Sequence, residues 1–193
     1  MNTAEAKVRY TPQDLLEIPD GDRYELVDGQ LVERHMGFWS SYVAGEIHWL
    51  LRDFCRTHPQ GWVLPEGTSY RCFPDAPDLV RKPDVSFIRL DRLPAEQAPR
   101  GHVPIHPDLA IEVLSPNDLA YEVEQKLEEY LRAGVRLIWV VNPDARTVRV
   151  IRADRSSILV RDIDEVIGED VLPGFCCPVA AFFRLPKEAG PAA

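Results

Sequence analysis

Hydrophobic and polar positions follow two different periods along this chain, and they predict a mixture of helices and strands. Between residues 23 and 35, the run RYELVDGQLVERH places Asp28-Gly29 between two segments in which apolar and polar residues alternate. Asp-Gly in such a setting is the strongest local signal for a β-hairpin. The preceding run TPQDLLEI, residues 11–18, predicts a short helix because Thr11 can cap it and a proline stands at its first position.

Apolar residues three or four positions apart predict two longer helices, over 40–56 and about 118–133. The expected caps and stops are Ser40 or Ser41 and His58-Pro59 for the first helix, and Asn117 or Asp118 and Gly134 for the second.

Short apolar runs predict the strands. We expect strands around 62–72, at 84–88 and at 109–114, followed by three successive strands in RLIWVV, TVRVIRA and SILVRDI, the last two forming a meander. With 193 residues, 45% of them hydrophobic, the chain can bury one core. We therefore expect a single α/β domain over 1–185 and a disordered tail over 186–193.

Charge and composition restrict the partners. The net charge of −9 argues against tight, non-specific nucleic-acid binding. It is compatible with an enzyme that binds DNA locally, because an acidic cluster that binds Mg²⁺ carries net negative charge until the ion arrives. The N-terminal residues lack a signal-peptide pattern, and no apolar run approaches the ~20 residues of a membrane helix. These features predict a soluble, cytoplasmic protein. The four cysteines, Cys55, Cys72, Cys176 and Cys177, lack metal-ligand spacing and are expected to be small buried thiols in a reducing cytosol.

One polar residue conflicts with its setting. Glu112 lies within the apolar run LAIEVL, which has the pattern of a strand buried on both faces. An ionised carboxylate there costs several kcal/mol, roughly, unless a cation, a metal or strong hydrogen-bond donors compensate it. The identity of that compensating group is the main question that the sequence raises.

Two other residues offer an answer. Asp84 begins the preceding strand, and Lys126 lies on the helix that follows Glu112. Two carboxylates on neighbouring strands can bind Mg²⁺, while a nearby lysine orients or deprotonates the attacking water. The alternative is that Asp84 ends a loop, that Glu112 pairs with a core arginine, and that Lys126 is a solvated residue paired with Glu122 or Glu129.

Several strings together resemble a known family. They are RYELVDGQLVE at 23–33, RKPDVSFI at 81–88, PDLAIEVLSPND at 107–118, KLEEYLRAGVRLIWVVNP at 126–143 and LPGFCCPVAAFF at 172–183. Their order resembles the PD-(D/E)XK nuclease superfamily, in the variant whose lysine has moved to the adjacent helix. More specifically, the chain resembles the Uma-two family of restriction endonucleases over about residues 10–183.

The resemblance implies a fold and a site. It implies a restriction-endonuclease-like fold, with a mixed central β-sheet flanked by helices. It further implies metal binding by Asp84 and Glu112, with Mg²⁺ or Mn²⁺ as the metal and Lys126 as the catalytic lysine. Glu25 matches an acidic position of the family that faces the same cleft, and a carboxylate at the hairpin edge is the alternative.

The chain also departs from its relatives. The position two residues after the second acid, where the superfamily usually has a lysine, is Leu114. Many relatives have a histidine at the start of the first long helix, where this chain has Ser40 or Ser41.

The expected function is Mg²⁺-dependent hydrolysis of DNA by a homodimer. The rivals are a binding module that keeps the fold without useful turnover, and a metal-dependent hydrolase of another nucleic acid, such as RNA. In the favoured case, Lys126 is expected to matter much more for chemistry than for folding.

Overall fold

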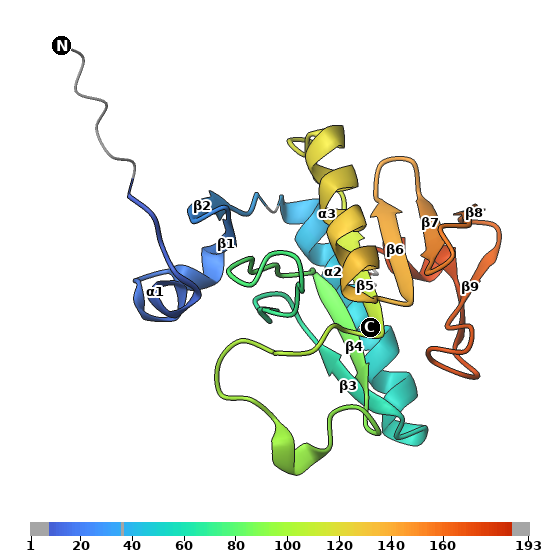
Figure 1. The fold of residues 1–193 in the computed structure, drawn as a ribbon. Coiled ribbons are helices and arrows are strands. Elements are labelled where there is room, and N and C mark those ends of the chain that lie inside the picture. Colours follow the sequence, from blue (N-terminus) through green and yellow to red (C-terminus); the bar gives the residue numbers. More distant parts are fainter. Residues whose placement is uncertain (1–7, 36, 187–193) are drawn as a thin grey trace, which may run out of the picture.

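A six-stranded mixed sheet forms the centre of the molecule in the computed structural model, which describes residues 8–35 and 37–186 (Figure 1). The strand order is β3-β4-β5-β6-β7-β8; β5 and β6 run parallel and the other neighbours are antiparallel. The bounds are β3 Gly61–Leu64, β4 Val85–Arg89, β5 Leu109–Val113, β6 Leu137–Asn142, β7 Thr147–Arg152 and β8 Ser157–Arg161. This arrangement confirms the expected α/β class and the flanking of a mixed sheet by helices.

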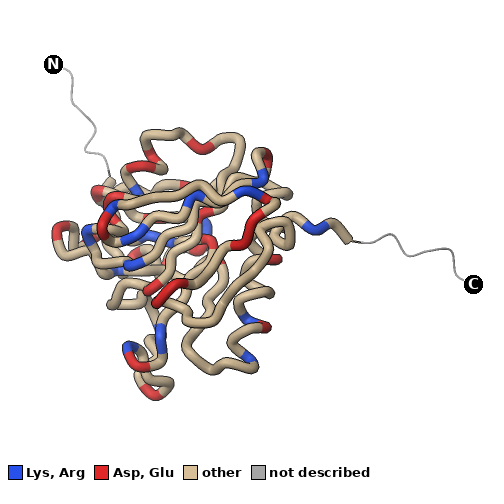
Figure 2. Tube along the Cα trace, turned by 90° about the vertical axis from the view of Figure 1, so that its right-hand side faces the viewer, with Lys and Arg blue, Asp and Glu red and all other residues tan. Residues whose placement is uncertain are grey.

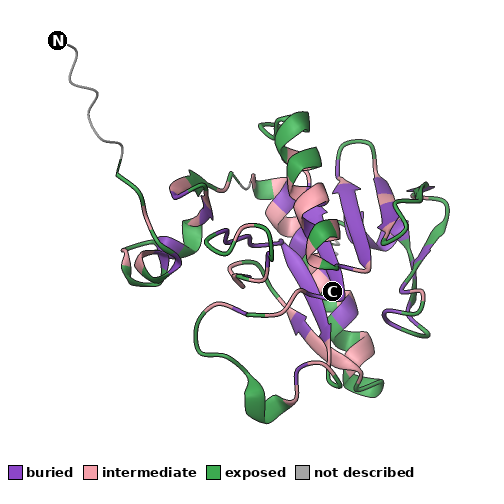
Figure 3. Ribbon diagram, in the orientation of Figure 1, coloured by how far each residue is buried: buried purple, intermediate pink, exposed green. Residues whose placement is uncertain are grey.

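Helices cover both faces of the sheet, and its middle strands are largely buried (Figure 3). Helix α2 (Phe38–Thr57) packs on one face with the short 3-10 helix Val179–Phe183, and α3 (Ala120–Ala133) packs on the other. Because side chains alternate along a strand, Leu109, Ile111 and Val113 join the core on the α2 side. Glu112 consequently points toward α3.

The predicted hairpin forms beside the sheet, from β1 (Tyr24–Val27) and β2 (Gln30–Glu33). Its turn residues Asp28 and Gly29 have φ angles of 50° and 73°, the left-handed conformation that an Asp-Gly turn permits. Leu26 and Val80 exchange backbone hydrogen bonds of 3.0 and 2.9 Å, which attach the hairpin to the segment before β4. The expected helix α1 (Pro12–Glu17) forms with Thr11 as its cap.

Several expected boundaries differ from those in the structure; for example, the strand expected at 84–88 is β4, Val85–Arg89. The strand expected over 62–72 ends at Leu64, because Pro65 lacks an N–H for continued pairing and the chain turns at Gly67, whose φ is 87°. Helix α2 begins at Phe38, so Ser40 lies in its first turn and accepts a hydrogen bond from the Gly37 N–H at 3.0 Å.

Helix α3 likewise begins later than expected, at Ala120. The Asp118 carboxylate accepts from the Ser115 N–H at 2.7 Å, so it stabilises the preceding turn instead of capping the helix. At the other end, Gly134 stops the helix with a φ of 99°, as the sequence predicts.

The C-terminal part adds a small hairpin that the sequence pattern did not indicate, formed by β9 (Glu165–Ile167) and β10 (Cys176–Pro178). The four cysteines are free thiols, but only Cys177 is buried; Cys55 and Cys72 are partly buried and Cys176 is exposed, so the expectation of buried thiols is wrong for Cys176. The expected tail lies outside the described residues, apart from Pro186. Within the described part of the chain, no helix combines the length and apolar character needed to cross a membrane.

Candidate functional site

Asp84 and Glu112 are brought together by the pairing of β4 and β5. Val85 pairs with Ile111 in antiparallel register, and the Asp84 N–H donates to the Ile111 carbonyl at 3.0 Å. Continuing this register places Asp84 directly opposite Glu112, on the face covered by α3. The structure therefore assembles the carboxylate pair that the sequence predicted, and both residues are buried.

The Asp84 carboxylate is held by two donors. Its Oδ2 accepts from the Val113 N–H at 2.7 Å, and its Oδ1 accepts from Arg34 Nη2 at 2.6 Å. Asp84 thus has a fixed orientation between the sheet backbone and a guanidinium that follows β2.

Two side chains of α3 form hydrogen bonds with the buried carboxylate of Glu112 and so compensate for its loss of solvation. Lys126 Nζ lies 2.8 Å from Glu112 Oε2, and the Tyr130 hydroxyl donates to Oε1 at 2.7 Å. Both partners lie four residues apart on one side of the helix. The alternative partners are wrong for two of the residues: Glu112 pairs with Lys126 and not with a core arginine, and Lys126 is largely buried and pairs with Glu112 and Glu25 instead of Glu122 or Glu129.

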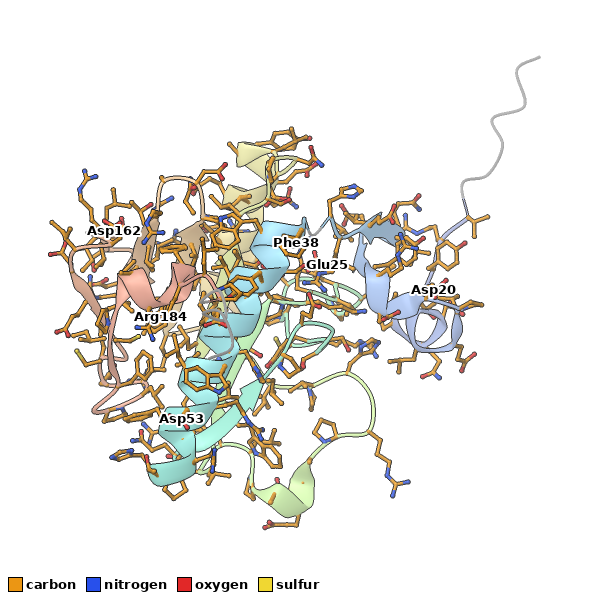
Figure 4. All side chains as sticks on the ribbon, turned by 180° about the vertical axis from the view of Figure 1, so that it is seen from behind. Asp20, Glu25, Phe38, Asp53, Asp162 and Arg184 are labelled. Atoms are coloured by element: carbon orange, nitrogen blue, oxygen red, sulfur yellow. The ribbon has the colours of Figure 1, made fainter. Side chains whose placement is uncertain are left out.

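Glu25 joins the same cluster from the hairpin. Its Oε2 accepts from Arg81 Nη1 at 2.8 Å, while Oε1 accepts from the Lys82 N–H at 2.7 Å and lies 3.0 Å from Lys126 Nζ. The residue is 4% exposed, so it is no hairpin-edge carboxylate. Figure 4 labels Glu25 where the hairpin meets the start of α2, marked by Phe38.

Their surroundings shift the pKa values of Glu112 and Glu25 in opposite directions. Burial raises the pKa of Glu112 to about 7, helped by the nearby Asp84 and Glu25 and opposed by Lys126. Burial also acts to raise the pKa of Glu25, but Lys126, Arg81 and the Lys82 N–H outweigh it and lower that pKa to about 2. Glu25 is therefore a permanent anion, whereas Glu112 can exchange a proton near neutral pH.

The pKa values of Asp84 and Lys126 also depend on the balance between burial and the neighbouring charges. Burial raises the pKa of Asp84 despite Lys126 and Arg34. Burial acts to lower the pKa of Lys126, but the carboxylates of Glu112, Glu25 and Asp84 raise it overall. Lys126 is thus an ammonium ion in this cluster, suited to stabilising negative charge.

These side chains line a cleft of about 250 Å³ between the hairpin, the sheet and the start of α3. Its charged lining residues are Glu25, Glu33, Arg34, Arg81, Asp84, Glu112, Asp118, Glu122 and Lys126. Acidic residues outnumber basic ones here. Elsewhere, Lys and Arg positions are interspersed with Asp and Glu positions along the trace in the view of Figure 2.

Sequence reasoning missed the arginine partners of Asp84 and Glu25. Arg34 comes directly after the predicted hairpin, and nothing in its spacing connects it to Asp84. Arg81 stands in the string RKPDVSFI without any sign of its partners, yet it bridges Glu25 and Glu129 at 2.8 and 2.6 Å. Tyr130 lies one helical turn after Lys126, a spacing from which it could orient the lysine or simply pack; in the structure its hydroxyl donates to Glu112.

Carboxylate oxygens are the protein ligands that a hard divalent ion such as Mg²⁺ takes. Across residues 8–35 and 37–186, no group of three or more His, Cys, Asp or Glu side chains is arranged to hold a metal. Two opposed carboxylates are nevertheless a sufficient protein contribution for Mg²⁺, which usually keeps several waters and takes only one or two carboxylates. Asp84 and Glu112 are the residues that would hold it.

Comparisons with known proteins agree with this fold. No curated protein matches the chain. A solved structure of a "putative nuclease belonging to DUF820" from Anabaena variabilis is similar in fold, with a TM-score of 0.73 and 20% sequence identity; the match covers 90% of this chain and 97% of the other. The family model Uma2, described as "Putative restriction endonuclease", matches residues 12–180. The chain therefore belongs to the Uma-two family.

Proposed function

We propose that the protein is a Mg²⁺-dependent DNA endonuclease, for which Mn²⁺ can replace Mg²⁺. The observation that carries this proposal is the cross-strand pair Asp84 and Glu112 in a cleft, with Lys126 2.8 Å from Glu112. A hard ion held by two carboxylates beside a buried ammonium is a combination suited to phosphodiester hydrolysis. Membership of the Uma-two family supports the same reaction class.

The residues take distinct parts in this proposal. Asp84 and Glu112 hold the ion, which when bound supplies Lewis-acid stabilisation of the phosphate and a more acidic water. Lys126, as an ammonium, orients that water or a phosphate oxygen and stabilises the charge that develops there. Glu25 and Tyr130 position the reacting groups, since Glu25 contacts Lys126 and Tyr130 contacts Glu112.

A nuclease-fold binding module is the second candidate. It is favoured by the full set of internal partners around the site, because Arg34, Lys126 and Tyr130 already engage the two carboxylates that would hold a metal. The net charge of −9 also favours weak binding of nucleic acid.

Incubation with supercoiled plasmid, linear DNA and RNA tests these functions. Each substrate is incubated with Mg²⁺ or Mn²⁺ and with wild type, Glu112→Gln and Glu124→Gln. Glu124 is a matched control because it forms an exposed ion pair with Arg149. We expect plasmid nicking by wild type and Glu124→Gln, and a loss on the order of 10² to 10⁴ in rate for Glu112→Gln.

The other outcomes are equally definite. Cleavage of RNA but not of DNA would show that RNA is the substrate. Wild-type rates in Glu112→Gln would reject the site, and an absence of cleavage with all three substrates would favour the binding module.

A further inference from the structure

Arg34 occupies an unusual position in the cleft. Its guanidinium lies 2.6 Å from Asp84 Oδ1, and its side chain is only 12% exposed. The other oxygen of Asp84 is fixed by the Val113 N–H. An ion that binds Asp84 through Oδ1 must therefore compete with Arg34, since both would be cations at the same oxygen.

The Arg34 guanidinium has more N–H donors than its bond to Asp84 uses. Among the residues that the structure describes, its hydrogen-bond acceptor is Asp84, which uses one of five N–H groups. The backbone of Arg34 is anchored, because its N–H donates to the Arg23 carbonyl at 2.9 Å. A displaced side chain would thus stay in the cleft, within reach of whatever binds next to Asp84.

The charges in the cleft determine which group could accept hydrogen bonds from a displaced Arg34 guanidinium. The local acids Glu25 and Glu112 are already paired with Arg81 and Lys126. A divalent ion on Asp84 would also repel the guanidinium. A phosphate beside the ion would remove this conflict, because it attracts both cations and matches the planar fork of an arginine.

We propose that Arg34 binds a phosphate of the substrate, and that it pairs with Asp84 only until a divalent ion and that phosphate enter the cleft. This inference rests on the proposed function, since it names how the same site takes its substrate. It makes metal and phosphate binding cooperative, with Arg34 as the residue that couples them.

Titration calorimetry on the full chain tests the coupling without requiring turnover. Mn²⁺ affinity is measured with and without a phosphorothioate-linked thymidine tetranucleotide, which supplies phosphate charge and resists cleavage. In wild type, the tetranucleotide should tighten Mn²⁺ binding by about tenfold or more. In Arg34→Met, Mn²⁺ alone should bind more tightly than in wild type, and the tetranucleotide should no longer tighten it.

Arg149→Met is the matched control. It makes the same substitution at an arginine whose partner, Glu124, lies outside the cleft lining, and it should behave as wild type. Arg34→Lys keeps the charge but lacks the fork. If Arg34→Met does not fold, Arg34→Lys carries the test: it should keep the weak Mn²⁺ binding of wild type and lose most of the coupling.

The outcomes separate this inference from the proposed function. Coupling in the Arg34 variants equal to that in Arg149→Met would overturn the inference and leave the metal site intact. Mn²⁺ binding by wild type without any effect of the tetranucleotide would do the same. No Mn²⁺ binding by folded wild type would overturn both.

Discussion

Single residues in this cleft serve folding and chemistry together, and Lys126 is the clearest case. The sequence suggested a lysine that matters mainly for catalysis. In the structure its ammonium lies between Glu112 and Glu25, at 2.8 and 3.0 Å, so it also neutralises two buried carboxylates. Removing one partner of a buried ion pair leaves an uncompensated charge, which costs more than the pair contributes.

We expect Lys126→Met to be inactive and to lower the free energy of unfolding of the metal-free protein by about 3 kcal/mol. Millimolar Mg²⁺ should restore part of this loss, because an ion held by Asp84 and Glu112 replaces the missing positive charge and binds only the native state. Urea denaturation with and without Mg²⁺ measures the effect. Equal stability of the variant and wild type without metal would show that the lysine is not structural.

The raised pKa of Glu112 predicts how stability changes with pH. Its pKa is about 7 in the folded protein and 4.5 ordinarily, so between these values the folded state holds a proton that the unfolded state releases. The free energy of unfolding therefore decreases as pH rises through this window, by an amount on the order of 1–3 kcal/mol. Glu25, whose pKa is about 2, changes its charge below the window.

Glu112→Gln isolates this contribution. His102 and His106 have pKa values lowered by burial, so they act in the opposite sense and remain in both proteins. Denaturation of metal-free wild type and Glu112→Gln at intervals from pH 4.5 to 7.5 should show the variant gaining stability relative to wild type as pH rises. A constant difference across the range would contradict the raised pKa.

Among the secondary-structure elements, α3 determines the site, because it positions both Lys126 and Tyr130 over Glu112. Its end is fixed by Gly134, whose φ of 99° is unfavourable for residues with a side chain. A Cβ there would also lie 3.0 Å from His106 Nε2.

We expect Gly134→Ala to lower the free energy of unfolding by about 1–2 kcal/mol. Gly45→Ala is the control, because Gly45 lies within α2 and a Cβ there meets nothing within 4 Å. That substitution should stabilise by about 0.5–1 kcal/mol, since alanine loses less backbone freedom than glycine in a helix. Urea denaturation distinguishes the two. Loss of stability in both variants would mean that the strain at Gly134 is not the cause.

Sequence reasoning succeeded where local chemistry decides the structure. The Asp28-Gly29 turn, the Thr11 cap and the Gly134 stop each depend on a few neighbouring residues. It failed where the decision depends on pairing, as in the strand that ends at Leu64, because edge pairing is set by the partner strand and by Pro65.

The site shows the same limit. Asp84 and Glu112 were predicted to converge because neighbouring strands bring their positions together. The pair Arg34 and Asp84, 50 positions apart, and the pair Arg81 and Glu25, 56 apart, depend on how the hairpin docks against the sheet. No periodicity in the sequence reports that docking.

For the whole molecule, the edge of the sheet at β8 supports the expected homodimer. In the strand order β8 stands last, and its consecutive residues Ile158 and Leu159 are 49% and 56% exposed. Because neighbours on a strand point to opposite faces, this edge is apolar on both sides. An open apolar edge favours pairing with another chain, and a second copy can pair with it about a two-fold axis.

We expect light scattering to give a mass near twice 21.9 kDa at micromolar concentration. Ile158→Lys should give the monomer, because a charged side chain on an edge strand opposes pairing. Ile163→Lys makes the same change in the turn after β8, at a residue that is 86% exposed, and should leave the dimer intact. A mass near 22 kDa for wild type at every concentration would rule out the dimer, and dissociation by both variants would place the contact beyond β8. If the dimer forms through β8, two clefts are held in one particle, and under the proposed function each cleft can take one strand of a duplex.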